Sequence, residues 1–195
     1  MGKIVQIMGK SASGKDTIYQ ALLRENKYGL KRVIPYTTRP IRSGEAEGRE
    51  YHFCTNDEAK KMMDEGRVIE IRGYYTVGGL WQYFTADDGQ IDLSKNNYLI
   101  IGTPKSYEKM KEYFGEESLV PIYIYLDNGD RLQRALNREK LQKSPNYAEM
   151  CRRYLADEED FSKERLDAAG INGGFKNAEL KSTIRMIEEY LGKVL

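Results

Sequence analysis

Three runs of apolar residues stand out along the chain, and they lack the regular alternation of a half-exposed strand. They cover residues 4–8, 97–101 and 120–126, and such runs are typical of strands buried on both faces of a parallel sheet. Apolar positions with helical spacing and further short strands lie between them. The helices are expected at about 15–25, 104–113, 128–138, 148–162 and 175–192, and the strands at 30–34 and 166–171. This alternation predicts an α/β fold, a parallel sheet covered by helices on both faces.

Residues 36–91 interrupt the alternation. The stretch 36–52 is polar, rich in Gly and Arg, and shows no helical period. A capping sequence predicts a short helix at 56–65, and aromatic and β-branched residues broken by glycines predict a small antiparallel sheet at 68–85. An insertion of this kind is where a second substrate would be held.

The domain boundaries follow from this pattern. A core is expected at 1–35 and 92–195, an inserted small mixed α/β subdomain at 36–91, and a polar hinge at 139–147. A ligand is expected at the carboxyl ends of the parallel strands, as in open α/β folds.

Composition narrows the range of partners. Lys and Arg number 31 against 30 Asp and Glu, a net charge of +1, which favours neither nucleic acid nor a membrane surface as a partner. The sequence shows no signal-peptide pattern, and Cys54 and Cys151 are interpreted as reduced thiols. The single histidine, His52, argues against a His-rich metal site. We therefore expect a cytoplasmic monomer or homodimer.

The segment Gly9-Lys10-Ser11-Ala12-Ser13-Gly14-Lys15 has the G-x-x-x-x-G-K spacing of a phosphate-binding loop. Its glycines allow a tight turn that points successive amide N–H groups at one anion, and the following helix adds a positive N-terminus. Lys15 would contact the β- and γ-phosphates of ATP. An ordinary strand–turn–helix connection is the alternative, which the flanking strand and helix disfavour. The predicted ATP contacts are Gly9, Ser11, Ala12, Ser13, Gly14, Lys15, Asp16 and Thr17.

The position after the lysine normally carries Ser or Thr, whose hydroxyl ligates Mg²⁺. Here it is Asp16, and Thr17 follows. A carboxylate is a good ligand for Mg²⁺, but it brings a negative charge close to a triphosphate. Two ways of holding the metal stay open, through Asp16 or through Thr17.

The most specific stretch is Thr37-Thr38-Arg39-Pro40-Ile41-Arg42-Ser43-Gly44-Glu45-Ala46-Glu47-Gly48-Arg49-Glu50-Tyr51-His52-Phe53. Arg39 and Arg42 are guanidinium forks suited to bidentate binding of a phosphate. Glu45 only accepts hydrogen bonds at neutral pH, and Tyr51 offers a phenolic O–H. A solvated charged loop is the alternative interpretation, and the spacing argues against it.

This stretch resembles the guanylate kinase signature, T-[ST]-R-x-x-[KR]-x-x-[DE]-x-x-G-x-x-Y-x-[FY], and matches it at every fixed position. The resemblance implies a fold of the P-loop NTPase type, with 36–91 as the subdomain that binds the nucleoside monophosphate and a helical lid at about 138–150 that closes over the phosphates. It also implies transfer of the γ-phosphate of ATP to GMP or dGMP, with Mg²⁺ as cofactor.

The resemblance also implies roles for individual residues. Arg39, Arg42 and Tyr51 would hold the phosphate of the acceptor, with Lys15 and Arg39 acting in catalysis. The guanine base would be bound by Glu70, with Glu45 beside it, while Tyr83 would contact the phosphate and Thr85 the base. Arg134 and Arg152 match lid arginines that would act in catalysis by neutralising the transferring group, and a solvated helix face with i,i+4 pairs is the alternative interpretation of both. Asn172 matches an asparagine that contacts adenine at the end of a strand.

Three departures from the family pattern affect the interpretation. Asp16 replaces a hydroxyl, Pro35-Tyr36 replace small hydroxyl residues, and Ile100-Ile101-Gly102-Thr103 replaces an acidic strand end. Two alternatives therefore stay open: a kinase of another small phosphorylated acceptor, and a catalytically silent domain of this type that binds a protein. The retained glycines and Lys15 favour the enzyme.

Overall fold

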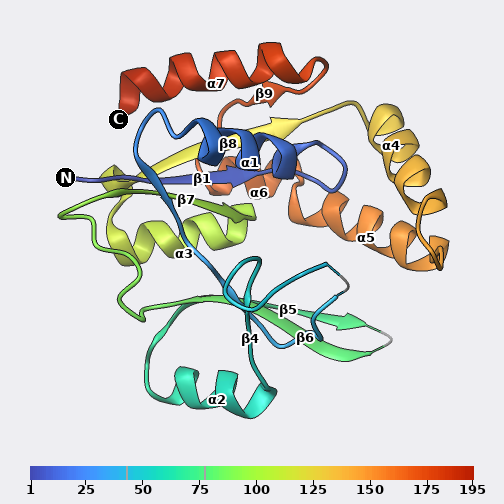
Figure 1. Cartoon of the computed structure of the whole chain (residues 1–195), viewed down its shortest axis with the longest axis horizontal. Coiled ribbons are helices and arrows are strands. Elements are labelled where there is room, and N and C mark those ends of the chain that lie inside the picture. The colour runs from blue at the N-terminus through green and yellow to red at the C-terminus, as the bar shows by residue number, and fades with distance from the viewer. Residues whose placement is uncertain (43, 77) are drawn as a thin grey trace.

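A five-stranded parallel sheet forms the larger part of the computed structural model, which describes residues 1–42, 44–76 and 78–195 (Figure 1). Its strands are β1 (Ile4–Met8), β2 (Leu30–Arg32), β7 (Asn97–Gly102), β8 (Leu119–Tyr125) and β9 (Phe175–Lys176), in the order β2-β7-β1-β8-β9. All four strand pairs are parallel. The predicted α/β fold is therefore confirmed, with β1 at the centre of the sheet.

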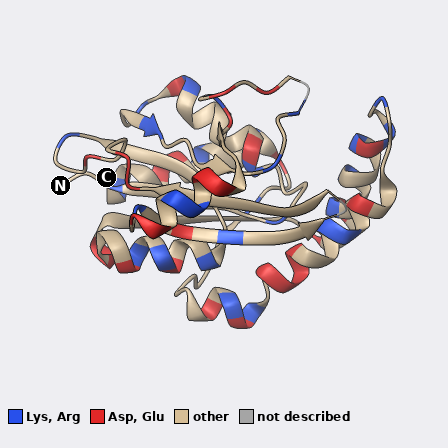
Figure 2. Ribbon diagram, turned by 90° about the horizontal axis from the view of Figure 1, so that it is seen from below, with Lys and Arg blue, Asp and Glu red and all other residues tan. Residues whose placement is uncertain are grey.

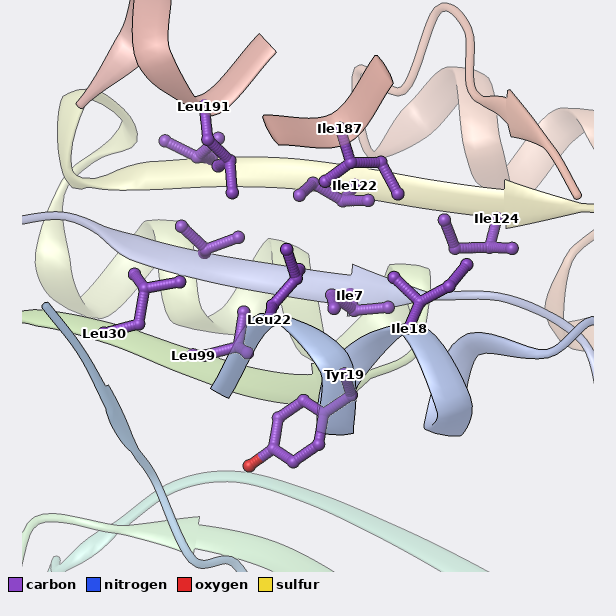
Figure 3. Packing of buried hydrophobic residues seen from close by; sticks show 12 residues of the cluster. Ile7, Ile18, Tyr19, Leu22, Leu30, Leu99, Ile122, Ile124, Ile187 and Leu191 are labelled. Carbon is purple, nitrogen blue, oxygen red and sulfur yellow. The ribbon is translucent and has the colours of Figure 1, made fainter. Parts of the chain in front are cut away.

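Helices cover both faces of this sheet because alternate residues of each strand point to opposite sides. Val5 and Ile7 of β1 pack with α1 (Lys15–Glu25) and α7 (Leu180–Val194). Ile4 and Met8 face the other side, toward α3 (Pro104–Phe114). Figure 3 shows Leu191 and Ile187 of α7 directed at β8, while Ile18 and Leu22 of α1 approach β1.

A second, mixed sheet lies beside the first and has its own small core (Figure 1). It contains β3 (Tyr36–Thr37), β4 (His52–Phe53), β5 (Val68–Thr76) and β6 (Gly79–Ala86), in the order β4-β3-β6-β5. Helix α2 (Asn56–Asp64) begins at a capping box formed by Thr55 and Glu58. Ala59 and Met62 of α2 pack on Phe84 of β6.

The remaining helices follow β8, and one prediction there is wrong. They are α4 (Asn128–Lys140), α5 (Tyr147–Asp160) and α6 (Lys163–Ala168), and the short 3-10 helix Glu116–Ser118 precedes β8. The expected strand at 166–171 is instead the end of α6 and the turn after it. Leu166, Ala169 and Ile171 reach the core from this helix end, so their apolar character does not require a strand. The last strand is β9, and α7 begins at Leu180 rather than near residue 175.

Basic and acidic residues are interspersed along the helices, as Figure 2 shows by the neighbouring blue and red bands of the ribbon. Most of the ribbon of the long strands carries no charged residue in the same view. Within the part of the chain that the structure describes, no helix has the length and apolar character needed to cross a bilayer.

Packing of α7 on the parallel sheet gives a test of the core. Ile187→Ala is expected to lower the free energy of unfolding by about 2–5 kcal/mol, because it removes a fully buried side chain and leaves a cavity. Met186→Ala is the matched control, since its side chain lies on the same helix but is 41% exposed. Urea unfolding measures both variants, and equal losses would contradict the packing described.

Candidate functional site

The loop between β1 and α1 has the geometry of a phosphate-binding turn. Ala12 (φ 63°) and Gly14 (φ 89°) adopt left-handed conformations, and α1 begins directly after Gly14. Asn177 Nδ2 donates a hydrogen bond to the Ser13 carbonyl oxygen at 2.7 Å. A Cβ atom on Gly14 would lie 2.2 Å from Asn177 Nδ2, so only glycine fits both the backbone conformation and the contact.

Helix α5 contacts this loop through two carboxylates. The Ser11 amide N–H donates to Asp157 Oδ2 at 2.8 Å, and Lys10 Nζ lies 2.6 Å from Glu158 Oε2. Arg131, which is 1% exposed, donates to the Ser11 carbonyl at 3.2 Å and to Glu158 Oε1 at 2.7 Å. Burial raises the pKa of Glu158, but the hydrogen bonds from Lys10 and Arg131 outweigh it, and the pKa is lowered overall. Glu158 therefore stays ionised beside the loop.

Two adjoining cavities open between the phosphate loop and the mixed sheet. The first, about 250 Å³, is bounded by the loop, by the tyrosine-rich strands β5 and β6, and by α5. The second, about 330 Å³, is bounded by the start of α1 and by the Arg-rich segment before β4. Lys15, Arg42 and Tyr51 line both cavities. A molecule that spans the two would contact the loop lysine and the Arg-rich segment together.

Arg39 is held by Glu45 beside these cavities. Arg39 Nη1 donates to Glu45 Oε2 at 2.7 Å and Nη2 donates to Oε1 at 2.6 Å, a bidentate pair. The hydrogen bonds from Arg39 are the largest cause of the lowered pKa of Glu45. The Arg42 amide also donates to Glu45, at 2.8 Å. Glu45 thus orients the backbone and guanidinium of the segment, while the Arg42 side chain faces the cavities.

Glu70 is buried at the start of β5, and its carboxylate is already engaged. Arg72 Nε donates to Glu70 Oε2 at 3.0 Å and Arg72 Nη2 to Oε1 at 3.2 Å. Thr85 Oγ1 on the neighbouring strand donates to the same Oε1 at 2.9 Å. The two predicted base-binding residues are therefore brought together, but Arg72 lies between their cluster and the first cavity, which it lines.

Tyrosines form the wall of the first cavity on the side of the mixed sheet. Tyr83 lies edge-on to Tyr51 and to Tyr74, with ring centres 5.7 and 5.9 Å apart. Burial raises the pKa of Tyr51, and burial also raises the pKa of Tyr74 to about 12. Their hydroxyls therefore stay protonated at neutral pH and can donate hydrogen bonds. Tyr74 donates to Asp160 of α5 at 3.2 Å.

The two residues after Lys15 point to different places. Asp16 lines the second cavity with Lys15, and its Oδ2 lies 3.4 Å from Lys15 Nζ. Thr17 does not line that cavity; it lines a groove between α1 and α7, which Asp16 also borders. In residues 1–42, 44–76 and 78–195, no group of three or more His, Cys, Asp or Glu side chains could hold a metal ion. A divalent cation here would depend on Asp16 together with phosphate oxygens and water.

The predicted residues of the C-terminal half lie in three different places. Arg152 of α5 lines the first cavity and pairs with Glu149 at 2.7 and 2.8 Å. Arg134 of α4 donates to the Asn177 carbonyl at 3.3 Å, behind the phosphate loop. Asn172 lies in the loop before β9, where it lines a third hollow of about 650 Å³. No strand ends at Asn172; the residue that follows the last strand and contacts the loop is Asn177.

Sequence reasoning missed the residues that connect distant segments. Arg72, Arg131, Asp157, Glu158 and Asn177 all contact the site or its loop from elements far along the chain. Of these residues, only Asn177 could be found from the local sequence, because it directly follows the short strand Phe175–Lys176.

Two of the residues that depart from the family pattern, Pro35 and Ile101, lie on the cavity walls, and Tyr36 does not. Pro35 and Ile101 line both cavities, and Tyr36 instead stacks on Phe84 and donates to Asp88 at 2.8 Å. The carboxylates of the first cavity come from α5, through Glu149, Asp157 and Asp160.

The parallel sheet and the glycine–lysine loop define a P-loop α/β protein. The sequence model of the guanylate kinase family matches residues 1–80. A guanylate kinase of Cupriavidus pinatubonensis is 30% identical over 191 residues, which cover 94% of this chain and 83% of that relative. One from Anaplasma phagocytophilum is 27% identical over 140 residues, 70% of this chain and 63% of the relative. The chain belongs to the guanylate kinase family.

A solved structure supports the same fold. The crystal structure of guanylate kinase from Anaplasma phagocytophilum superposes with a TM-score of 0.70 at 19% identity, covering 98% of this chain and 85% of that one. The predicted family and fold class are thus both confirmed.

The Arg39–Glu45 pair predicts a pH-dependent stability. Glu45→Gln is expected to destabilise the fold near neutral pH, because the buried guanidinium loses its charged partner. Since the folded-state pKa of Glu45 is lowered, its contribution is present above the unfolded-state pKa and is lost as the pH falls through the folded-state pKa. The difference between wild type and variant should therefore shrink on acidification.

Urea unfolding over a series of pH values measures this difference. Glu112→Gln is the control, since Glu112 is 63% exposed and pairs only with Lys109 on its own helix in the described part of the chain. A difference between wild type and Glu45→Gln that stays constant at every pH would contradict the assignment.

Proposed function

We propose that this chain transfers the γ-phosphate of ATP to GMP or dGMP, giving ADP and the diphosphate. The observation that carries the proposal is the second cavity, where Lys15 faces Arg39, Arg42 and Tyr51. A phosphate-loop lysine and an Arg-rich acceptor segment on opposite walls of one space suit transfer between two phosphate groups. The guanine nucleotide is proposed because the family and the relatives are guanylate kinases.

The two sheets would divide the work. Residues 1–35 and 92–195 would form the core that binds ATP through the loop amides, Lys15 and the N-terminus of α1. Residues 36–91 would bind the nucleoside monophosphate, and the segment at about 138–150 would act as a lid. The cavities at the junction of the sheets support this division, because residues of both parts line them.

The protein's contribution to phosphoryl transfer would be positioning and charge, since the reaction needs no covalent intermediate on the chain. Lys15 would neutralise charge on the transferring group, and Arg42 with Tyr51 would hold the acceptor phosphate. Arg39 would act mainly through Glu45, which accepts one hydrogen bond from each terminal nitrogen of the guanidinium. Glu45 would thereby keep the segment in place before a nucleotide binds.

The site fits a magnesium ion that is held largely by its substrate. Mg²⁺ is usually bound by one or two carboxylates together with substrate phosphates and water, and Asp16 supplies one carboxylate beside Lys15. When bound, the ion would neutralise charge on the outer phosphates. Thr17 is the weaker candidate, because it faces the groove between α1 and α7.

The two arginines matched to the lid, Arg134 and Arg152, would act in different parts of the site. Arg152 lines the first cavity and is proposed to break its hydrogen bonds to Glu149 and bind the transferring phosphate instead. Arg134 and Asn177 would act on the ATP side, because Arg134 donates a hydrogen bond to the Asn177 carbonyl and both side chains lie near Gly14 of the phosphate loop. For the adenine, Asn177 replaces Asn172 as the candidate on this side of the site.

A second candidate function is phosphorylation of a different small acceptor. Pro35 and Ile101 favour it, because they present no hydrogen-bonding side chain to either cavity. The catalytically silent alternative is disfavoured by the intact loop geometry and by Lys15 in the cavities.

A coupled assay of ADP formation tests the function, with GMP, dGMP, AMP, UMP and CMP as acceptors. Wild type should turn over the guanine nucleotides, and Lys15→Ala should lower kcat by about 10²-fold or more, since it removes the charge at the transferring phosphate. Lys61→Ala, an exposed lysine of α2, is the control. Turnover restricted to another acceptor would select the second candidate, and near-normal turnover by Lys15→Ala would refute the site.

A further inference from the structure

The Arg72 guanidinium is paired with Glu70 and lines the first cavity on the side formed by strands β5 and β6. Its Nε and Nη2 pair side-on with the two carboxylate oxygens of Glu70. Among the residues that the structure describes, Nη1 has no hydrogen-bond acceptor, and the side chain is 16% exposed. A guanidinium fixed along one edge presents the N–H groups of its other edge as a planar fork.

Glu70 is not available to a ligand in this arrangement. Both of its oxygens accept hydrogen bonds from Arg72, and Oε1 also accepts from Thr85. A base that donates hydrogen bonds to Glu70 would have to displace a paired, largely buried guanidinium and leave that charge without its partner, which is costly. The cluster therefore offers the cavity donors rather than acceptors.

The surroundings of Arg72 favour a planar, uncharged acceptor group over a second anion. Tyr74, Tyr83 and Trp81 line the same cavity and supply flat apolar faces. Helix α5 lines the same cavity with carboxylates as well as arginines, Glu149, Asp157 and Asp160 beside Arg152 and Arg153, so it adds no uniform positive charge that would select a second anion. Two adjacent acceptor atoms on an aromatic ring match both the guanidinium fork and these walls.

We propose that Arg72, oriented by Glu70, is a specificity-determining residue that binds the O6/N7 edge of a purine acceptor. Arginine pairs in bidentate fashion with O6 and N7 of guanine, whereas adenine presents an amino donor next to N7. Hypoxanthine has the same O6/N7 edge as guanine and lacks only the 2-amino group. The site therefore distinguishes 6-oxopurines from adenine and does not use the 2-amino group. This inference rests on the proposed function.

The test compares kcat/KM for GMP, 7-deaza-GMP, IMP and AMP. In 7-deaza-GMP a C–H group replaces N7, so wild type should use it less well than GMP by about tenfold or more, the effect of losing a hydrogen bond to a charged donor. IMP and GMP should be used with similar kcat/KM, and AMP poorly.

Two variants test whether Arg72 causes these differences in kcat/KM. In Arg72→Met, the ratio of kcat/KM for GMP to that for 7-deaza-GMP should fall toward one. The ratio for GMP to AMP should fall toward one as well. Because that variant leaves Glu70 buried without its partner, the double variant Glu70→Gln/Arg72→Met removes both charges and should give the same ratios. Arg185→Met is the control, since Arg185 lies on α7 with a side chain that is 75% exposed; it should keep the wild-type ratios.

The outcomes separate this inference from the proposed function. Turnover of GMP with no penalty for 7-deaza-GMP, or with strong rejection of IMP, would overturn the role of Arg72 and leave the kinase intact. Wild-type ratios retained in the double variant would do the same. Absence of turnover with every purine monophosphate would overturn both proposals.

Discussion

The conformation of residues 9–14 is the constraint on which the rest of the site depends. The backbone leaves the central strand β1, passes through two left-handed residues, and must present its amide groups at the start of α1. Such a turn exposes backbone donors and acceptors that need partners. Residues distant in sequence supply them: Asn177 for the Ser13 carbonyl, Arg131 for the Ser11 carbonyl, and Asp157 for the Ser11 amide. The loop therefore has its shape only when the whole parallel sheet and α5 are assembled.

Charge pairing gives the cavities their character. Arginines that face the cavities are held by carboxylates from their own neighbourhood, as in the pairs Arg39–Glu45, Arg72–Glu70 and Arg152–Glu149. Each pair orients a guanidinium before a ligand arrives, and a fork that is already oriented loses less entropy on binding. The arrangement also separates two kinds of site. Arg42 and Lys15 line both cavities and are proposed to bind phosphate, whereas Arg72 keeps one edge free of Glu70.

Apart from Asp16 in the phosphate loop, the departures from the family pattern include residues that line the cavities proposed for the acceptor. Pro35 and Ile101 bring no polar side chain to the cavity walls, and Arg72 lines the first cavity as a cation. The acceptor segment 37–53, in contrast, matches the family signature at every fixed position, and the phosphate loop keeps both glycines and Lys15 and departs at Asp16. This distribution supports the proposed phosphoryl transfer together with the proposed role of Arg72 in recognising the acceptor. Carboxylates now reach the first cavity from α5 rather than from the end of β7, so the position of that helix influences the electrostatics of the site.

Local sequence determined the phosphate loop, the Arg-rich acceptor segment, the alternation of strands and helices, and the capping of α2. Each of these depends on spacing within a few residues, which periodicity, glycine placement and side-chain chemistry report directly. Local apolar character misassigned 166–171, because Leu166 and Ile171 pack in the core from a helix end as well as they would from a strand. Tertiary structure alone decided which asparagine meets the loop, that Glu70 is occupied by Arg72, and that α5 supplies the acidic wall. Those contacts join residues brought together by chain folding and strand register, and no short-range pattern in the sequence encodes them.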